Sequence, residues 1–250
     1  MSSVTSDARD GGLVPDVNKR SAGSGHASAV RGMFGRIAPT YDLLNHALSG
    51  GLDIVWRRRA VSLLSRAKPG PMLDLCAGTL DLSVLLDRAR PHDRLIAADF
   101  SKEMLERGRR KVPRAEVVLA DAQCLPFEDG EMAAVVCGFG VRNVADPLRA
   151  VREVRRVLAP GGAFVTLEFF RPETAIARTL HGGYASLVLP WVGGLLSGDR
   201  GAYDYLARSM KGFLSRREYE AALAGAGFAR VQAEDLSFGV ASLVYAEVPQ

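Results

Sequence analysis

The chain has 250 residues, of which 48% are hydrophobic and 24% are charged, and its formal net charge is +4 at pH 7. These values are typical of a globular protein with a sizeable core, built as one domain or as one domain with an insertion. No apolar run reaches the roughly 20 residues of a membrane-spanning helix, which excludes a membrane-spanning protein. The charges are dispersed along the chain, so the mildly basic balance is no signature of nucleic-acid binding.

The cysteines and the first residues narrow the class of protein further. Cys76, Cys124 and Cys137 are widely spaced and no histidine lies near them, so we expect neither a disulfide framework nor a metal site. Cys76 and Cys137 lie in apolar runs and are predicted to be buried strand residues. The N-terminus lacks the basic and apolar pattern of a secretory signal, so we expect a cytoplasmic protein.

The first part of the chain divides into a tail and a helical segment. Residues 1–28 are rich in Ser, Gly, Asp and Ala and have no apolar periodicity, which predicts a disordered tail. The domain then spans 29–250. Its first part, 29–68, has apolar residues at helical spacing, with breaks at Pro39 and at the Gly50–Gly51 pair, and is predicted to be a helical cap.

Strands and helices alternate from residue 71 to residue 170. Near-continuous apolar strands that alternate with helices predict an α/β fold with a doubly wound parallel sheet. Ser101 is the expected N-cap of the second helix, and Pro160–Gly162 is an expected turn. The expected strands are 71–76, 94–99, 116–121, 133–139 and 163–170, and the expected helices are 79–89, 101–111 and 146–159.

The C-terminal part breaks this alternation. Residues 171–212 are predicted to be an insertion that forms a lid over the site, and a helix follows at 215–227. The segments 228–238 and 240–248 alternate in polarity and are joined at Gly239, so we expect them to close the sheet as an antiparallel pair. The complete sheet would then have seven strands, most of them parallel.

The end of the first strand runs into the segment 74–81, DLCAGTLD. Nucleotides bind at this position of a doubly wound sheet. Gly78 lets the backbone approach a ligand, while Thr79 and the following helix N-terminus supply hydrogen-bond donors. A GxGxxG loop would need glycines at the positions of Leu80 and Ser83, so the sequence disfavours a pyrophosphate-binding loop and an NAD-dependent dehydrogenase.

Acids at the next two strand ends suggest the ligand. Asp99 lies 21 residues after Gly78, where a carboxylate accepts hydrogen bonds from ribose hydroxyls; the alternative is a helix-capping or surface acid. Asp121 is followed by Ala122 and by the apolar residues 125–127. The acid suits the exocyclic amine of an adenine and the apolar residues suit its ring face; the alternative is an acid that only stabilises a turn. One acid at each strand end predicts a nucleoside without phosphates, S-adenosylmethionine, with its amino-acid end over Gly78.

At this point the sequence resembles a family. Residues 71–170 resemble the core of class I S-adenosylmethionine-dependent methyltransferases, whose sixth and seventh strands would be the pair at 228–248. The segment 34–45 resembles the opening signature of the menaquinone/ubiquinone biosynthesis C-methyltransferases, and 138–144 (GFGVRNV) resembles their second signature. The resemblance covers roughly 30–248, and it also includes Trp56–Arg58, Leu167–Phe169, Arg171–Pro172 and parts of 189–206.

The resemblance implies a set of residues that bind the cofactor. Two positions depart from the family. Leu80 stands where the family usually has glycine or alanine, so its side chain must point away from the methionine moiety. Gly138 stands where the family often has serine, so a hydroxyl contact to the cofactor is absent. The implied cofactor-binding residues are Asp74, Gly78, Thr79, Asp81, Asp99, Met104, Asp121, Ala122 and Gly138.

The implied reaction is methyl transfer to a ring carbon of a polyprenylated hydroquinone, with demethylmenaquinol favoured over the ubiquinone-pathway benzoquinol. The ring carbon becomes nucleophilic when a hydroxyl with a pKa near 10 loses its proton. Arg142 is expected to stabilise the phenolate, Asn143 to orient the quinol oxygen, and Tyr41 to close over the site. The alternatives are pairing of Arg142 with Asp146 or a helix C-terminus, and a core position for Tyr41.

Several alternatives stay open on the sequence. Leu80 and Gly138 are compatible with a non-catalytic scaffold that binds S-adenosylmethionine, and a methyltransferase for another small molecule is a further reading. The apolar segment 185–196 could form a lid for the prenyl tail, form a surface-docking patch or pack against the core sheet. His46 and His181 have no visible partner. Peripheral contact with the inner face of the cell membrane and a homodimer are both compatible with the sequence, whereas a nucleic-acid partner and a metal are not expected.

Overall fold

The structure of the protein is a computed structural model. It describes residues 32, 35, 41–65, 67–173, 175–183, 205 and 208–250. The predicted tail at 1–28 and the apolar stretch at 185–196 therefore lie outside the described residues. The proposed boundaries of the cap and the lid stay predictions.

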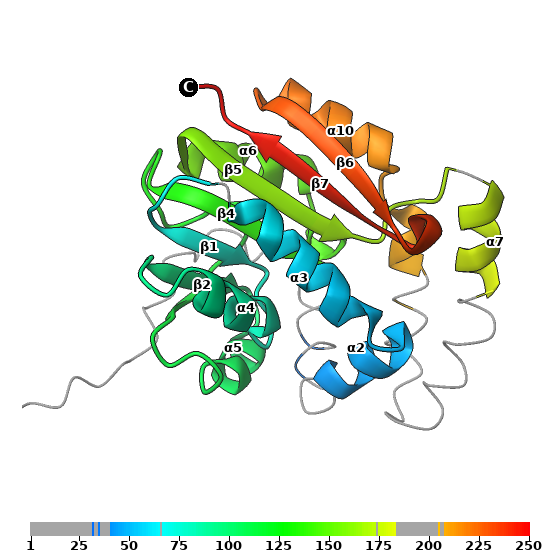
Figure 1. The fold of residues 1–250 in the computed structure, drawn as a ribbon, viewed down its shortest axis with the longest axis horizontal. Coiled ribbons are helices and arrows are strands. Elements are labelled where there is room, and N and C mark those ends of the chain that lie inside the picture. Colours follow the sequence, from blue (N-terminus) through cyan, green and yellow to red (C-terminus); the bar gives the residue numbers. More distant parts are fainter. Residues whose placement is uncertain are drawn as a thin grey trace, which may run out of the picture.

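The described residues form a seven-stranded sheet in the order β3-β2-β1-β4-β5-β7-β6 (Figure 1). The first five strands are parallel, while β7 is antiparallel to both β5 and β6. The fold class and the closing antiparallel pair are thus confirmed. The strands are β1 (Met72–Leu75), β2 (Leu95–Asp99), β3 (Glu116–Leu119), β4 (Met132–Gly138), β5 (Leu158–Glu168), β6 (Ala229–Leu236) and β7 (Ala241–Glu247).

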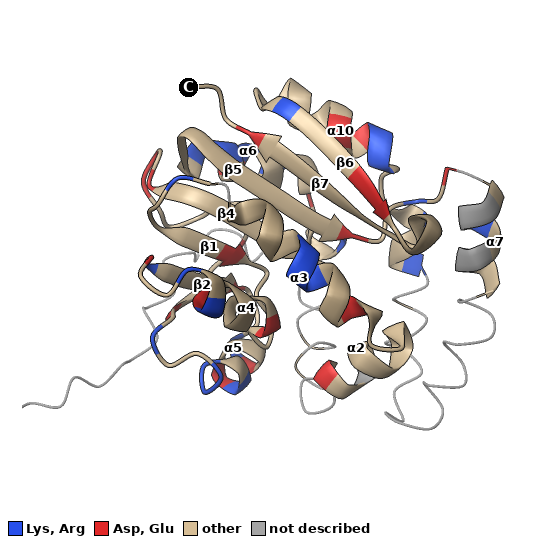
Figure 2. Ribbon diagram, viewed as in Figure 1, with Lys and Arg blue, Asp and Glu red and all other residues tan. Residues whose placement is uncertain are grey.

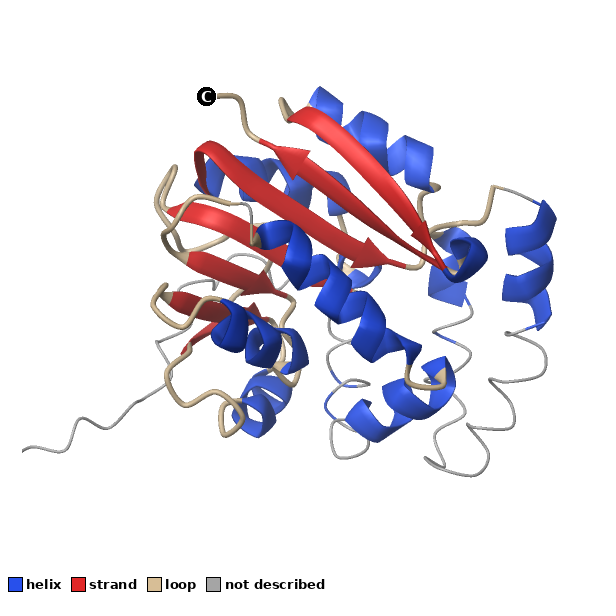
Figure 3. Cartoon of the chain, in the orientation of Figure 1, coloured by secondary structure: helices blue, strands red, loops and turns tan. Residues whose placement is uncertain are grey.

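Helices cover both faces of this sheet, as Figure 3 shows. In the view of Figure 1, α3 passes in front of the strands with α4 beside it, and α2 lies below the strand ends, whereas α6 and α10 lie behind. The helices of the described chain are α2 (Tyr41–Ser49), α3 (Leu52–Leu64), α4 (Asp81–Ala89), α5 (Lys102–Gly108), α6 (Pro147–Val157), α7 (Ala175–Gly183) and α10 (Arg216–Gly225), with short 3-10 turns η1 (Val141–Asn143) and η3 (Ser237–Gly239).

The strands are apolar on both faces because both faces are buried. Met72 packs in a core cluster with Trp56 and Leu64 of α3 and Leu86 of α4. The next residue, Leu73, points the other way, into a cluster built on α6 and α10. This two-sided burial explains why the strand sequences read as continuous apolar runs rather than as alternating patterns.

Local sequence signals explain where most elements begin. Gly50 and Gly51 have φ of 58° and 79°, and they separate α2 from α3 as expected. The Ser101 hydroxyl accepts the Met104 amide at the start of α5, which confirms this N-cap. Ser215 and Glu218 form a reciprocal capping box at α10.

Two expectations need correction. Pro160–Gly162 is not a turn between elements but part of β5: Met132 pairs with Leu158 and Ala134 with Ala163, so the extra residues bulge out of the ladder. Cys76 is partly exposed rather than buried, because it follows β1 and turns with a φ of 56°. Cys137 is buried as predicted.

The surface carries both signs of charge. In Figure 2, Lys and Arg are interspersed with Asp and Glu over the described elements, in keeping with the nearly balanced charge of the sequence. Across the ranges that the structure describes, no helix has the length and apolar character needed to cross a membrane.

Leu80 has an unusual backbone conformation for a branched side chain. It is the N-cap of α4 with a φ of 66°, in the left-handed region, and its side chain is fully buried against Ala97 and Leu105. Its side chain therefore points into the core, as the sequence required.

We expect Leu80→Ala to destabilise the protein by about 2–4 kcal/mol through the lost packing. Leu80→Gly should be less destabilising than Leu80→Ala by about 1 kcal/mol, because only glycine adopts this φ without strain. Urea unfolding of the three proteins tests this order. A glycine variant that is less stable than the alanine variant would show that the left-handed conformation carries no strain here.

Candidate active site

The candidate active site lies where the carboxyl ends of the parallel strands meet. The strand order reverses between β1 and β4, which is the position where doubly wound sheets bind ligands. The loops that leave these two strands are packed tightly. A Cβ placed on Gly140 would lie 2.3 Å from the Cβ of Cys76, so only glycine fits at this contact.

Gly78 lies at the centre of the loop between β1 and α4, here named the cofactor loop (76–80). Its φ is 54°, and an ideal Cβ there would lie 3.7 Å from Met104 Cε and 4.0 Å from a ring carbon of Tyr41. The fold therefore brings together three of the predicted residues from three separate segments. Thr79 is buried next to them, and its hydroxyl donates to Asp42 on α2.

Asp99 connects the cofactor loop to α5. Its Oδ2 accepts the backbone amide of Gly78 at 2.9 Å, and its Oδ1 accepts the amide of Ser101 at 2.8 Å. The carboxylate is buried at the end of β2. It therefore lies at the predicted position beside the loop, and it also supports the start of α5.

Asp121 and Ala122 follow β3 at the same edge. Asp121 Oδ1 accepts the backbone amide of Gln123 at 2.8 Å, and the side-chain oxygen of Gln123 accepts the amide of Asp146 at 3.0 Å. Ala122 and Leu125, which follow the acid in the chain, are buried. The acid and the apolar wall are therefore adjacent, as the sequence predicted.

Gly138 ends β4 and leaves space for a neighbour. A Cβ at this position would lie 2.7 Å from Cδ1 of Leu82, the second residue of α4. A serine here would therefore require the Leu82 side chain to move. Leu82 therefore occupies the space that a side chain at position 138 would take.

Asp74 and Asp81 lie on either side of the cofactor loop. Asp74 is 1% exposed and accepts the Ser83 hydroxyl at 2.6 Å. Burial, supplemented by the nearby charge of Asp99, raises the pKa of Asp74 to about 7. Asp81 Oδ1 contacts Lys111 at 2.6 Å, while its buried Oδ2 has no hydrogen-bond partner among the described residues.

Arg142 forms a buried ion pair that the sequence analysis did not predict. Its Nη1 lies 2.5 Å from Oε1 of Glu168, at the end of β5, and also donates to the Phe139 carbonyl at 2.8 Å. Asp146, the partner considered from the sequence, instead caps α6. Burial alone would lower the pKa of Arg142, but the Glu168 carboxylate outweighs it and raises that pKa.

The surroundings of Arg142 are aromatic and phenolic. Its guanidinium lies 5.5 Å from the ring centre of Phe169, and its Nε is buried without a hydrogen-bond partner in the described part of the chain. Burial raises the pKa of the Tyr41 phenol, although the Arg142 charge lowers it. The Tyr205 hydroxyl donates to Asn143 Oδ1 at 3.0 Å. The fold thus places the predicted Tyr41, Arg142 and Asn143 in one cluster.

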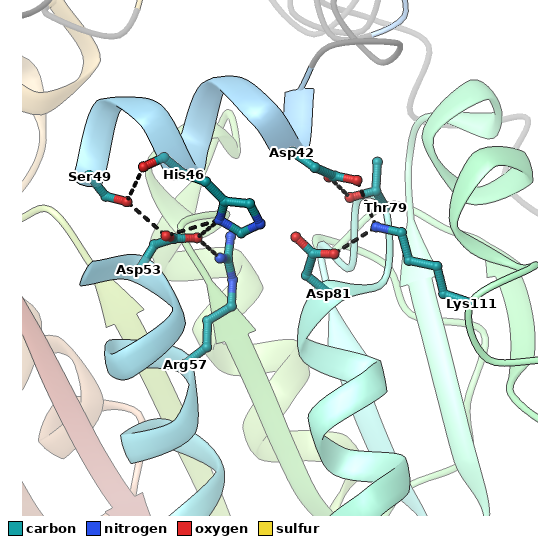
Figure 4. Close-up of polar contacts among 8 residues, drawn as sticks. All are labelled: Asp42, His46, Ser49, Asp53, Arg57, Thr79, Asp81 and Lys111. Carbon is teal, nitrogen blue, oxygen red and sulfur yellow. Dashed lines mark hydrogen bonds and ion pairs between the residues drawn. The ribbon is translucent and has the colours of Figure 1, made fainter. Parts of the chain in front are cut away.

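The sequence analysis missed a second charge cluster between α2 and α3 (Figure 4). His46 Nδ1 lies 2.8 Å from Oδ2 of the buried Asp53, which also accepts the Ser49 hydroxyl and contacts Arg57. His46 therefore does have a partner, contrary to our expectation. The signal was the break at Gly50–Gly51, which turns the chain back between His46 and Asp53. The side chain of His181 lies outside the described residues.

Comparison with known proteins gives a consistent family. A model of the ubiE/COQ5 methyltransferase family matches residues 21–247. The chain is 44% identical to the demethylmenaquinone methyltransferase of Thermus thermophilus over 87% of this chain and 100% of that protein. It is 38% identical to the ubiquinone/menaquinone biosynthesis C-methyltransferase UbiE of Geotalea uraniireducens over 87% of this chain and 95% of that protein.

Solved structures match the fold at lower sequence identity. A possible histamine N-methyltransferase from Thermotoga maritima has a TM-score of 0.64 and 18% identity, with 87% of this chain and 99% of that structure covered. The [4+2]-cyclase SpnF has a TM-score of 0.63 and 17% identity, with 89% and 97% covered. These likenesses show the methyltransferase-type fold, and the cyclase shows that one fold carries different reactions.

Asp74 predicts a pH dependence of stability. With a pKa of about 7 in the folded protein and 3.8 as its ordinary value, Asp74 keeps a proton that the unfolded chain loses as pH rises above about 4. The contribution of Asp74 to the free energy of unfolding therefore decreases as the pH rises from about 4 to about 7. Relative to Asp74→Asn, the wild-type protein should lose up to ~1.4 kcal/mol per pH unit in this window. Urea unfolding of both proteins from pH 4.5 to 8 measures this; parallel curves would show that Asp74 keeps an ordinary pKa.

Proposed function

This chain belongs to the ubiE/COQ5 methyltransferase family, and we propose that it transfers a methyl group from S-adenosylmethionine to a ring carbon of a polyprenylated hydroquinone. Demethylmenaquinol is the favoured acceptor, because the Thermus relative with full-length coverage is named for it. The observation that carries the proposal is the meeting of the cofactor loop with the Arg142–Asn143 cluster at one edge of the sheet. The ubiquinone-pathway benzoquinol is the second candidate, favoured by the UbiE relatives.

The acids that flank the cofactor loop fit S-adenosylmethionine, which supplies an electrophilic methyl group on its sulfonium ion. The buried Oδ2 of Asp81 lacks a hydrogen-bond partner among the described residues, so it suits the ammonium of the amino-acid end. Asp99 ends β2 beside the loop with a buried carboxylate, at the position where a carboxylate accepts the ribose hydroxyls of a nucleoside bound to a doubly wound sheet.

The other assigned residues line the same edge. Gly78, Thr79 and Met104 would hold the methionine part of the cofactor, and Asp121 with Ala122 would hold the adenine. Asp74 would act from beneath the loop, through its hydrogen bond to Ser83. Gly138 would present its backbone to the cofactor at the end of β4, since the space of a side chain there is taken by Leu82.

Arg142 would stabilise the negative oxygen of the hydroquinone as its proton leaves. Because Glu168 already balances the guanidinium charge, the Nε–H, which has no hydrogen-bond partner within the described ranges, is the group that would donate to that oxygen. Arginine does not give up its own proton near neutral pH, so it acts as a donor and not as a base. Asn143, held by the Tyr205 hydroxyl, would orient the same oxygen, and Tyr41 would cover it from α2.

The departures at Leu80 and Gly138 give no support to a non-catalytic scaffold. The Leu80 side chain is buried in the core, away from the loop surface. The space that a side chain at position 138 would occupy is taken by Leu82. Both departures are therefore compatible with a working site.

We also propose that the enzyme works in the cytoplasm and contacts the membrane surface from that side. The reason is the chemistry of the acceptor, whose prenyl tail partitions into a bilayer at ~0.8 kcal/mol for each buried methylene group. The exposed Leu43 and Val55 on α2 and α3 are available for such a contact.

The direct test is incubation of the purified protein with methyl-labelled S-adenosylmethionine and a reduced acceptor in detergent. Demethylmenaquinol and the demethylated benzoquinol are offered separately. We expect label on the ring carbon of demethylmenaquinol, detected by mass spectrometry. Label on neither acceptor, with cofactor binding intact by calorimetry, would contradict the proposed reaction.

The role of Arg142 needs a variant that keeps the fold. Removing Arg142 alone would leave Glu168 buried and unpaired, which destabilises a protein by about 3–5 kcal/mol. We therefore combine Arg142→Met with Glu168→Gln. Turnover should fall at least tenfold while the Kd for S-adenosylmethionine stays within about twofold, because oxyanion donors act on the transition state.

The matched control combines Arg94→Met with Glu116→Gln. This exposed ion pair, 2.7 Å long, lies at the amino ends of β2 and β3, at the opposite edge of the sheet. Turnover by the Arg94→Met, Glu116→Gln protein should equal that of the wild-type protein. Wild-type turnover in the Arg142→Met, Glu168→Gln protein would exclude the donor role.

A further inference from the structure

Lys111 contacts two carboxylates that come from different helices (Figure 4). Its Nζ lies 2.7 Å from Oδ2 of Asp42, in the first turn of α2, and 2.6 Å from Oδ1 of Asp81, the first residue of α4. The other oxygen of Asp42 accepts the hydroxyl of Thr79 in the cofactor loop. We name the two contacts of Lys111 the Lys111 bridge.

The backbone around Lys111 is fixed against the cofactor loop. The Lys111 amide donates to the Gly108 carbonyl at 2.8 Å in the turn after α5. A Cβ on Gly108 would lie 2.6 Å from the backbone carbon of Thr79 and from Cδ1 of Leu80. The turn that carries Lys111 therefore touches the loop directly, and its side chain extends from a defined point.

The charges of the bridge depend on one another. The side chains of Lys111, Asp42 and Asp81 are 30%, 28% and 22% exposed, so water screens them only in part. One ammonium lies between two carboxylates. Without it, two negative charges would face each other across the cofactor loop, and their repulsion would separate α2 from α4.

The bridge also bears on the site through Tyr41. Tyr41 precedes Asp42 on α2, and one of its ring carbons lies 4.0 Å from an ideal Cβ at Gly78. A displacement of Asp42 would therefore move the aromatic ring that lies beside the loop. The position of α2 and the shape of the cofactor loop are thus coupled through Lys111 in addition to the hydrogen bond between Asp42 and Thr79.

We infer that Lys111 is a positioning residue that keeps α2 closed over the cofactor loop, so that its charge determines how tightly S-adenosylmethionine binds. The inference rests on the proposed function, because it takes S-adenosylmethionine as the ligand of the loop. It assigns a role to a side chain that need not touch the substrate or the methyl group.

The test is the Kd for S-adenosylmethionine of Lys111→Met, measured by calorimetry. We expect an increase of about tenfold, which corresponds to a loss of ~1.4 kcal/mol of binding free energy. Lys111→Arg keeps the charge and should bind within about threefold of the wild-type protein. Adding Asp42→Asn to Lys111→Met removes one of the two facing charges, so we expect it to restore part of the affinity.

Lys102→Met is the matched control. Lys102 lies on α5 and is more than half exposed, with Glu106 as its partner at 3.5 Å, so its loss should leave the Kd unchanged. Hydrogen exchange of the ligand-free proteins gives a second readout. Amides of α2 should exchange faster in Lys111→Met than in Lys102→Met, whereas amides of α10 should not differ. If methionine prevents folding, Lys111→Gln is measured in its place.

The outcomes separate this inference from the proposed function. Wild-type affinity in Lys111→Met, or equally weak binding by Lys111→Met and Lys111→Arg, would overturn the role of the charge. Faster exchange throughout the protein would show a general loss of stability and would overturn the local role. If the wild-type protein itself does not bind S-adenosylmethionine, the proposed function fails together with the inference.

Discussion

The site depends on one buried carboxylate that binds two backbone amides. Asp99 ends β2 and accepts hydrogen bonds from Gly78, in the cofactor loop, and from Ser101, before α5. A loop with several residues in the left-handed region has little regular hydrogen bonding of its own, so an external acceptor keeps it in place. The same carboxylate is the acceptor that we propose for the ribose, so the structural and the proposed binding role share one group.

Two other buried acids are stabilised in different ways. Asp53 is fully paired: Ser49, His46 and Arg57 lower its pKa although burial alone would raise it. Among the residues that the structure describes, the Ser83 hydroxyl is the side-chain donor to Asp74, and burial raises the pKa of this acid instead. The first acid therefore stays charged between α2 and α3, whereas the second is near its midpoint beneath the cofactor loop at neutral pH. A neutral form of Asp74 reduces the negative charge beside Asp99.

Local patterns in the sequence predicted the sheet, its closing strands and the acids at the strand ends. These features follow from residue type and spacing alone, since apolar runs define strands, and residues such as Ser101 define helix starts. The pairing of Arg142 with Glu168, 26 residues away, was not predictable in this way. Long cationic side chains reach several acids, and only the packed fold decides which one lies near.

The same limit explains the other misses. Lys111 and Asp42 are 69 residues apart, and no periodicity links a cap helix to the turn after α5. His46 and Asp53 are close in sequence, but their contact depends on the angle at which α2 and α3 meet. The bulge at Pro160–Gly162 was read as a turn because proline and glycine mark both kinds of backbone irregularity.

The contact between Gly138 and Leu82 has a consequence for how such a site changes during evolution. A Cβ at position 138 would lie 2.7 Å from Leu82 Cδ1, so the residues at these two positions are not independent. Because Cδ1 is the far end of a flexible side chain, a serine could enter β4 once Leu82 rotates, and a smaller side chain at position 82 would make that movement unnecessary. A change at one of the two positions therefore alters how readily a change at the other is accepted.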